Sequence, residues 1–158
     1  EANGLQVMEE RFHVRFIEYM PMGEASRKCP ELFVPGGEVK DRIEASFGPL
    51  EAVIPEVGDG PASRFRIKGS IGEVGFINAI SNHFCAGCNR IRLTATGSLR
   101  TCLLSDLETD LKGPLRSGAT DSELAEVFRE GVLLKPWGHC LGSPDRPEVN
   151  GRMSAIGG

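Results

Sequence analysis

At residues 84–93 the chain reads Phe84-Cys85-Ala86-Gly87-Cys88-Asn89-Arg90-Ile91-Arg92-Leu93, and the rest of the sequence is organised around this stretch. Thirteen residues separate Cys88 from Cys102, so three of the five cysteines have the spacing C-x2-C-x13-C. Two arginines, Arg90 and Arg92, lie shortly after the second cysteine. Thiolates bind soft metals, and guanidinium groups bind phosphate oxygens in pairs. The stretch therefore predicts a metal site beside an anion site.

The three clustered cysteines leave the identity of the metal open. Three ligands without a fourth favour an iron–sulfur cluster with one open iron, whereas structural zinc usually takes four protein ligands. Zinc would need to recruit His83 or Cys140. A set of ordinary buried thiols is the third interpretation, and the C-x2-C spacing beside charged residues argues against it. His13 and His139 have no predicted role, since a lone histidine is seldom a ligand.

The segment after the second cysteine predicts a hairpin. Residues 89–95 have strand character, Thr96-Gly97-Ser98 suits a turn, and residues 99–103 suit the returning strand. Such a hairpin brings Cys102 back to the neighbourhood of Cys88. A long gap in sequence then becomes a short one in space.

Strand alternation places Arg90 and Arg92 on the same face of this hairpin, about 7 Å apart. On their own, the two arginines would suit the solvated face of an edge strand. Their position beside a metal motif favours another interpretation, in which they bind a phosphorylated ligand next to an open iron.

The remaining elements alternate between helix and strand. Residues 13–20 predict a buried strand and residues 37–47 a helix with apolar side chains at every fourth position. Three short runs at 51–54, 63–67 and 72–77 predict an antiparallel meander. Capping-box patterns begin at Ser105 and Thr120, and the second opens an amphipathic helix that ends at Lys135-Pro136. Residues 136–158 predict an extended tail.

Composition limits the possible classes of protein. The 158 residues are 40% hydrophobic and fit one folded domain. The net charge of −4 arises from 18 basic and 22 acidic side chains in mixed order, which predicts neither nucleic-acid nor membrane binding. An odd cysteine count with metal-like spacing indicates a reducing compartment, the cytoplasm. The sequence opens without Met, so we expect a fragment, and the possibility of an upstream targeting segment stays open.

Three motifs in order carry a resemblance to a known family. They are Arg15-Phe-Ile-Glu-Tyr-Met20, then the stretch from Cys85 to Thr94 with Cys102-Leu103, and the ending Met153-Ser-Ala-Ile-Gly157-Gly158. Together they resemble the C-terminal half of the GTP 3′,8-cyclase family, radical S-adenosylmethionine lyases of molybdenum cofactor biosynthesis. The resemblance covers essentially the whole chain.

The resemblance implies a role for each motif. Cys85, Cys88 and Cys102 would bind a C-terminal 4Fe–4S cluster whose open iron contacts the guanine of GTP. Further implied roles are GTP binding by Asn89, Arg90, Ile91 and Arg92, S-adenosylmethionine contact by Met20 and Arg15, and an active-site tail at Gly157 and Gly158. Cys29 and Cys140 match no ligand position.

One departure from the family decides what this chain can do alone. The family's radical-generating half binds a second 4Fe–4S cluster and S-adenosylmethionine through C-x3-C-x2-C, a spacing absent here. We therefore expect no catalysis by the chain in isolation, and expect it to work with an N-terminal radical half in a homodimeric full-length enzyme that cyclises GTP.

The predicted fold class is α/β or α+β. Residues 1–49 would be the last β/α unit of an incomplete, TIM-like barrel, as the family implies, and residues 50–158 an antiparallel sheet with flanking helices. The competing function is a non-enzymatic, zinc-stabilised module in which Arg90, Arg92 and Arg100 contact a phosphorylated partner. Mixed charge and few aromatic residues argue against nucleic acid as that partner.

Overall fold

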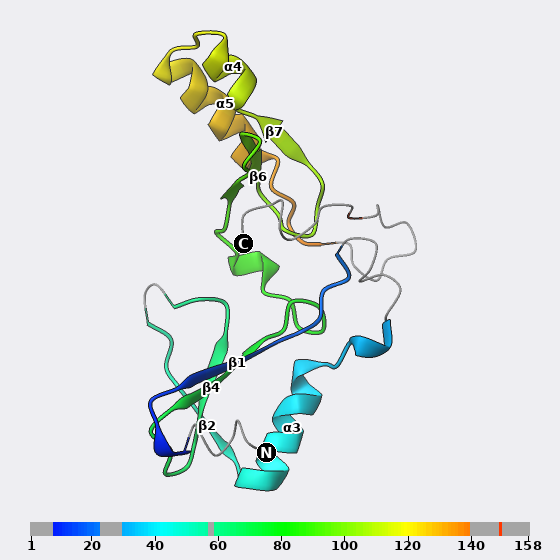
Figure 1. Cartoon of the computed structure of the whole chain (residues 1–158), viewed down its shortest axis with the longest axis vertical. Coiled ribbons are helices and arrows are strands. Elements are labelled where there is room, and N and C mark those ends of the chain that lie inside the picture. The colour runs from blue at the N-terminus through cyan, green and yellow to red at the C-terminus, as the bar shows by residue number, and fades with distance from the viewer. Residues whose placement is uncertain (1–7, 23–29, 57–58, 140–148, 150–158) are drawn as a thin grey trace. The chain divides into compact units, whose positions relative to one another are not determined.

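The structure, a computed structural model, describes residues 8–22, 30–56, 59–139 and 149 (Figure 1). Tertiary contacts divide the chain into two compact units. The first unit comprises Glu1–Met20 and Glu31–Phe84, and the second comprises Pro21–Pro30 and Cys85–Gly158. Each unit has a sheet of its own. The predicted mixture of helices with antiparallel strands is confirmed.

The first unit contains a four-stranded sheet in the order β1-β4-β3-β2. Its strands are β1 (His13–Ile17), β2 (Leu50–Ala52), β3 (Ser63–Ile67) and β4 (Glu73–Ile77). The pairs β2–β3 and β3–β4 are antiparallel, which confirms the predicted meander, while β1 pairs in parallel with β4. Strands from residues 1–49 and from residues 50–158 thus form one sheet. That division of the chain, and the barrel origin of its first part, stay predictions.

Strand β1 is half-buried rather than buried, contrary to the prediction. It lies at the edge of the sheet, and exposure alternates along it. Val14 and Phe16 pack against the core, while His13, Arg15 and Ile17 face outward. Successive side chains of a strand point to opposite faces, and the core of the first unit covers only one of them.

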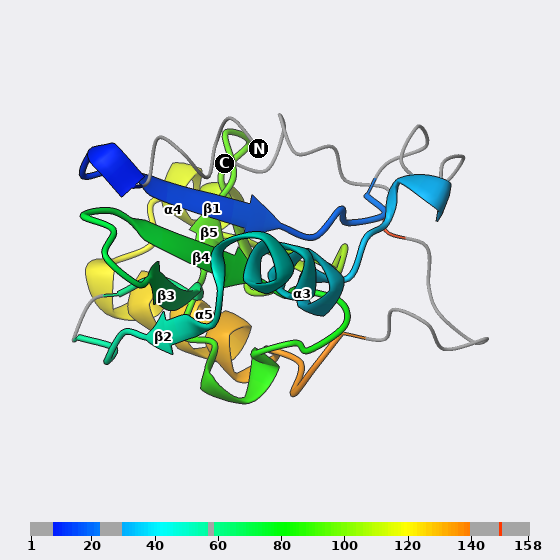
Figure 2. The ribbon, with the colours of Figure 1, turned by 90° about the horizontal axis from the view of Figure 1, so that it is seen from below.

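The core of the first unit lies between its sheet and helix α3 (Gly36–Phe47), which confirms the helix predicted at 37–47. Ile67, Val74 and Phe76 are buried at its centre. Helix α3 packs its apolar positions over them, and the helix crosses the sheet in Figure 2. The partly buried side chains around this centre are Met8, Val14, Phe16, Val39, Ile43, Phe47, Leu50 and Phe65. A short 3₁₀ turn, η1 (Pro30–Leu32), precedes α3.

The second unit contains a three-stranded antiparallel sheet and two helices. Its elements are β5 (Arg92–Leu93), β6 (Ser98–Arg100), β7 (Glu108–Asp110), α4 (Lys112–Arg116) and α5 (Asp121–Leu133). The predicted hairpin is therefore confirmed, with shorter strands than expected. Gly97 turns the chain at φ 88°, in the left-handed region that favours glycine.

Only one of the two capping-box patterns begins a helix. Thr120 caps α5 with the full reciprocal arrangement with Glu123. The pattern at Ser105 begins no helix, because the hydroxyl accepts a hydrogen bond from the nearby Leu107 N–H and the chain then enters β7. A serine hydroxyl can accept a hydrogen bond from a nearby backbone N–H in a turn as well as at the start of a helix. Here the pairing of β7 with β6 favours the turn over the helix.

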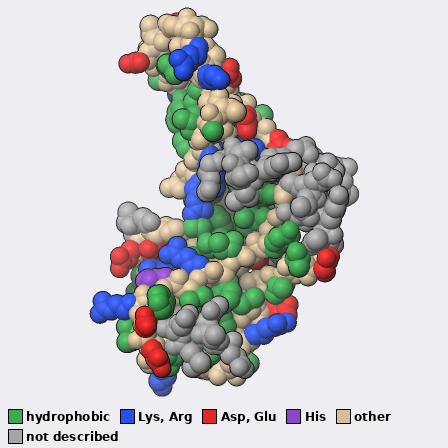
Figure 3. All heavy atoms as spheres, in the orientation of Figure 1, with side chains coloured by type: hydrophobic (Ala, Val, Ile, Leu, Met, Phe, Trp, Pro, Cys, Tyr) green, Lys and Arg blue, Asp and Glu red, His purple; other side chains and the backbone are tan. Residues whose placement is uncertain are grey.

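Charge is mixed on the described surface. Lysine, arginine and carboxylate side chains are interspersed over the face in Figure 3, without a field of one sign. Within the described residues, no helix has both the length and the apolar character that crossing a membrane requires.

Candidate metal and anion site

The first two cysteines of the motif lie on a single turn of 3₁₀ helix. Element η2 covers Cys85–Gly87, and the Cys88 N–H donates to the Cys85 carbonyl at 3.1 Å. Residues three apart in a 3₁₀ helix lie one above the other. This turn explains how C-x2-C spacing presents two thiols on one side of the chain.

The third cysteine returns to the motif through the hairpin. Arg92 pairs with Arg100 and Leu93 with Leu99, so the chain runs back along β5 before it reaches Cys102. All three motif cysteines belong to the second unit, are half-buried and are free thiols. Their joint ligation of one cluster stays a prediction.

Arg100 is buried and fully engaged inside the second unit, with 2% of its surface exposed. Its guanidinium contacts the Asp106 carboxylate at 2.8 Å and the Glu108 carboxylate at 3.3 Å. It also donates to the carbonyls of Cys102 and Leu103, each at 3.3 Å. The predicted contact of Arg100 with a phosphorylated partner is therefore wrong. Instead, Arg100 anchors the backbone that carries the third cysteine.

Lys135 anchors the other side of the motif. Its ammonium donates to the carbonyl of Arg90 at 2.7 Å and to the carbonyl of Thr101 at 2.5 Å. Arg90 lies two residues after Cys88, and Thr101 directly precedes Cys102. A single side chain from beyond α5 thus joins the two backbone segments on which these cysteines lie.

His139 approaches the first cysteine. A ring nitrogen of His139 lies within 4.8 Å of the Cys85 sulfur, and both residues are half-buried in the second unit. The backbone of the preceding residue is also close to Cys85, since a Cβ added to Gly138 would lie 3.9 Å from the Cys85 Cβ. Cys88 does not share this close group. No local sequence pattern distinguishes His139 from the other residues of the tail, so its position near Cys85 is visible only in the structure.

Zinc would need a further ligand, either His83 or Cys140. His83 is exposed and directly precedes Phe84, the last residue of the first unit. Cys140 lies outside the described residues. Neither is tested as a ligand by the structure.

The anion-binding residues predicted around the arginines lie next to the hairpin. Arg90 and Arg92 are half-buried, and Asn89 and Ile91 are exposed. Strand β5 begins only at Arg92, so Arg90 precedes the regular alternation. The expectation that both guanidiniums share one face stays a prediction.

In the first unit, a buried carboxylate lies between the two residues predicted to contact S-adenosylmethionine. Glu18 accepts hydrogen bonds from the N–H groups of Gly36 at 2.9 Å, Ile80 at 2.8 Å and Ser81 at 2.9 Å, and from the Ser81 hydroxyl. Burial opposes ionisation, but these bonds outweigh it and hold the pKa of Glu18 below its usual value. Glu18 therefore ties together β1, the start of α3 and the loop after β4.

The flanking residues of Glu18 occupy different surroundings. Arg15 lies exposed on the outer face of β1, and Met20 is half-buried three residues beyond the strand. Their contact with S-adenosylmethionine stays a prediction. Cys29, Gly157 and Gly158 lie outside the described residues.

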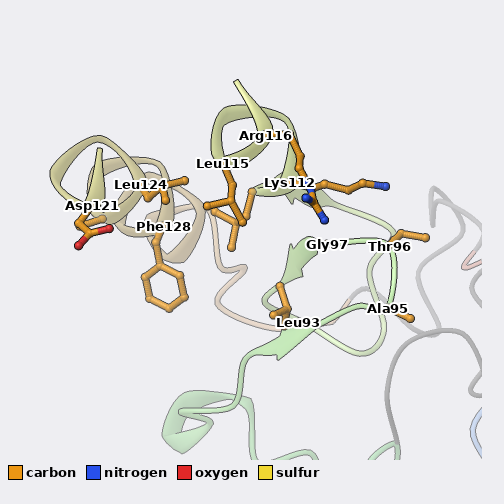
Figure 4. Close-up of a pocket in the computed structure, with 12 residues that line it drawn as sticks. Leu93, Ala95, Thr96, Gly97, Lys112, Leu115, Arg116, Asp121, Leu124 and Phe128 are labelled. Carbon is orange, nitrogen blue, oxygen red and sulfur yellow. The ribbon is translucent and has the colours of Figure 1, made fainter. Parts of the chain in front are cut away.

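A separate pocket of about 720 Å³ lies in the second unit (Figure 4). Leu93 from β5 and Leu115 from α4 point into it, and Lys112 and Arg116 lie together at one side. Its remaining lining is mainly apolar and comes from the β5–β6 turn, α4 and α5. The pocket includes none of the three motif cysteines.

The sequence profile of the family described as Molybdenum Cofactor Synthesis C matches residues 12–141, which span both units. The chain belongs to the Molybdenum Cofactor Synthesis C family. The cysteine hairpin, the buried Arg100 and the Lys135 bridge all lie within the matched residues of this family member.

Three curated relatives of this Molybdenum Cofactor Synthesis C protein share one name. The GTP 3′,8-cyclase of Moorella thermoacetica is 49% identical over 95% of the chain and 45% of its own length. Those of Pelotomaculum thermopropionicum and Desulforamulus reducens are each 45% identical, over 99% and 92% of the chain and 48% and 44% of their own lengths. The chain thus spans about half the length of the curated relatives that it matches.

Proposed function

We propose that the chain is the C-terminal, GTP-binding and auxiliary-cluster region of a GTP 3′,8-cyclase. The observation that carries the proposal is the cysteine hairpin: three free thiols of one unit, at the spacing of the motif, inside the region matched by the family. Relatives that are named GTP 3′,8-cyclase align with nearly the whole chain at over 40% identity.

The donor set fits a thiolate-bound cluster. Cys85 and Cys88 share a 3₁₀ turn, and Cys102 is fixed by Arg100 and Lys135 through neighbouring carbonyls. Half-buried, free thiols suit the reducing cytoplasm. When bound by three cysteines, a 4Fe–4S cluster would offer an open iron to the guanine base.

The arginines beside the motif would hold the phosphates of GTP. Arg90 and Arg92 follow Cys88 closely in the sequence, and both are half-buried, so part of each side chain is exposed to solvent. Asn89 and Ile91 alternate with them and would contact the same nucleotide. The work of this region is positioning, which lowers a barrier by holding reacting groups in the right geometry.

The first unit would complete an S-adenosylmethionine site contributed mainly by an N-terminal radical half. In this proposal β1 is the last strand of an incomplete barrel, with Met20 and Arg15 facing the cofactor, and residues 50–158 follow as the C-terminal region. The full-length lyase would use a second 4Fe–4S cluster, act as a homodimer and be helped by the tail at Gly157 and Gly158. The chain alone would not catalyse the reaction.

Metal analysis tests the cluster. Iron, acid-labile sulfide and zinc are measured on the chain after reconstitution without oxygen, beside the variant Cys102→Ala and the control Cys29→Ala. We expect about four iron and four sulfide per chain in the wild type and the control, and a large loss in Cys102→Ala. Stoichiometric zinc without sulfide would overturn the cluster assignment in favour of a zinc module.

Calorimetric titration with GTP tests the arginines on the same preparation. Arg92→Ala should weaken GTP binding at least tenfold, because a charge-assisted contact is lost. Arg42→Ala is the matched control, since Arg42 is an exposed residue of α3 in the first unit. Equal affinity of Arg92→Ala and wild type would remove Arg92 from the site.

A further inference from the structure

The cysteine motif is contacted by two side chains that follow α5, more than thirty residues away in the sequence. We propose that Lys135 and His139 are positioning residues of the cluster site. Lys135 fixes the two backbone segments that carry Cys88 and Cys102, and His139 donates a hydrogen bond to the Cys85 sulfur when the cluster is bound. The inference rests on the proposed function, because it requires a cluster on these cysteines.

The Lys135 bridge stands where the hairpin ladder stops. Regular pairing of β5 with β6 ends at Arg92 and Arg100, and two carbonyls beyond this pair, those of Arg90 and Thr101, receive the Lys135 ammonium. An ammonium has three donors and no acceptor, so it can join two carbonyls where two strands can no longer pair directly. The strands can therefore separate at the cysteines without leaving these carbonyls unpaired.

His139 has a different relation to the motif. Its ring nitrogen lies within 4.8 Å of the Cys85 sulfur, and the backbone at Gly138 lies against the Cys85 side chain. Each iron of a 4Fe–4S cluster carries three sulfides and one further ligand, so His139 and Cys85 would not share an iron. A hydrogen bond to the cysteine sulfur fits this separation after a small side-chain rotation. Such bonds set the reduction potential of a cluster.

The potential of the reconstituted cluster tests His139. We expect His139→Leu to shift the midpoint potential to more negative values, because a donor to the thiolate stabilises the more negative, reduced cluster. His139→Gln keeps an N–H donor and should restore part of the shift. Trp137→Ala is the matched control from the same segment, since Trp137 is 95% exposed. The same potential and the same electron paramagnetic resonance signal in His139→Leu and wild type would overturn the role of His139.

The rate of cluster loss to a chelator tests Lys135. Lys135→Met keeps the hydrocarbon stem and removes the donors, and we expect cluster loss at least threefold faster than in the wild type. Lys135→Arg retains donors for both carbonyls and should recover part of the difference. An unchanged rate in Lys135→Met would overturn the bridging role. If Lys135→Met does not fold, the rate of cluster loss in Lys135→Arg decides. A rate equal to that of the wild type supports a bridge made by donors at this position. A rate as fast as that of the thermally unfolded Trp137→Ala protein contradicts it.

The two levels of the proposal fail differently. Wild-type chain without iron and sulfide overturns the proposed function, and this inference with it. A wild-type cluster whose potential and chelation rate are the same in all four variants overturns only the positioning roles and leaves the cluster region intact.

Discussion

The two units bury apolar and polar side chains in different proportions. In the first unit, Ile67, Val74 and Phe76 form an apolar centre in which the Phe76 ring packs against two further phenylalanines, and Glu18 and Glu73 are also buried. In the second unit, the buried residues within the described ranges include Thr94, Arg100 and Thr101 beside the apolar Met22, Leu99 and Val149. Within the described residues, buried apolar side chains therefore outnumber buried polar ones in the first unit, whereas the two kinds are equally frequent in the second.

This difference indicates how each unit depends on its surroundings. An apolar core is insensitive to metal and modestly sensitive to pH, because water exclusion drives it. A small unit with few buried apolar side chains often gains stability from a bound metal, since binding to the folded state alone adds to folding free energy. The comparison predicts a metal-linked second unit and a metal-independent first unit.

The largest expected effect is in the apolar core. Phe76→Ala removes the ring that stacks on Phe16 and meets Phe65 edge to face, and we expect a loss of about 3–5 kcal/mol from the free energy of unfolding of the first unit. Hydrogen exchange resolved by peptide measures each unit separately. Ile54→Ala is the control, since Ile54 is 84% exposed. An equal loss of protection in both units would break the comparison, because the two cores would then act as one.

The next effect concerns the buried guanidinium. Arg100→Met should destabilise the second unit by about 3 kcal/mol, because two carboxylates and two carbonyls lose their partner. It should also lower the iron retained per chain, since Cys102 loses its anchor. Arg129→Met is the control on the exposed surface of α5. Retained stability with full iron content would show that the polar network does not support the cysteines.

A smaller effect comes from the buried carboxylate of the first unit. Glu18→Gln should cost about 2 kcal/mol, because an amide offers one acceptor oxygen where the carboxylate receives four donors. The pKa of Glu18 is lowered in the folded state, so its contribution is complete above the unfolded-state pKa and is lost as pH falls through the folded-state pKa.

The pH dependence sharpens the comparison further. Urea unfolding of the wild type from pH 7 down to pH 3 should show stability falling on the acid side, and this acid-linked loss should be smaller in Glu18→Gln. Glu38→Gln serves as the control for an exposed carboxylate of α3. If the free energy of unfolding falls equally with pH in the wild type and in Glu18→Gln, the loss of stability at low pH does not arise from Glu18.

The smallest expected effect is at the cap of α5. Thr120→Ala removes the hydroxyl that accepts the Glu123 N–H and should cost about 1 kcal/mol. Thr120→Ser keeps the oxygen and should be close to wild type. Thermal unfolding of the second unit measures both variants. Because α5 leads to Lys135, the iron bound per chain is measured as well. A larger fractional loss of iron in Thr120→Ala than the fraction of protein unfolded would link the helix directly to the cysteine site.

Local patterns predicted much of the fold. The helix ending at Phe47, the meander from residue 50 and the hairpin at Gly97 follow from side-chain period and turn residues, which act over a few positions. Local patterns also misled. The prediction that β1 is buried was wrong, and the capping-box pattern at Ser105 lies in an irregular segment before β7, because neighbouring strands and the position of the core decide both features.

The sequence by itself determined the chemistry available to this protein: three thiols at metal-binding spacing, two arginines beside them, and the Arg15–Met20 motif with its carboxylate at Glu18. Only the tertiary structure decided how these groups are held. Lys135 meets carbonyls 45 and 34 positions earlier in the chain, and Arg100 turns inward to carboxylates instead of outward to a ligand. The physical reason is range, since spacing along a chain encodes contacts within one turn or hairpin, whereas contacts between distant segments depend on how the whole unit packs.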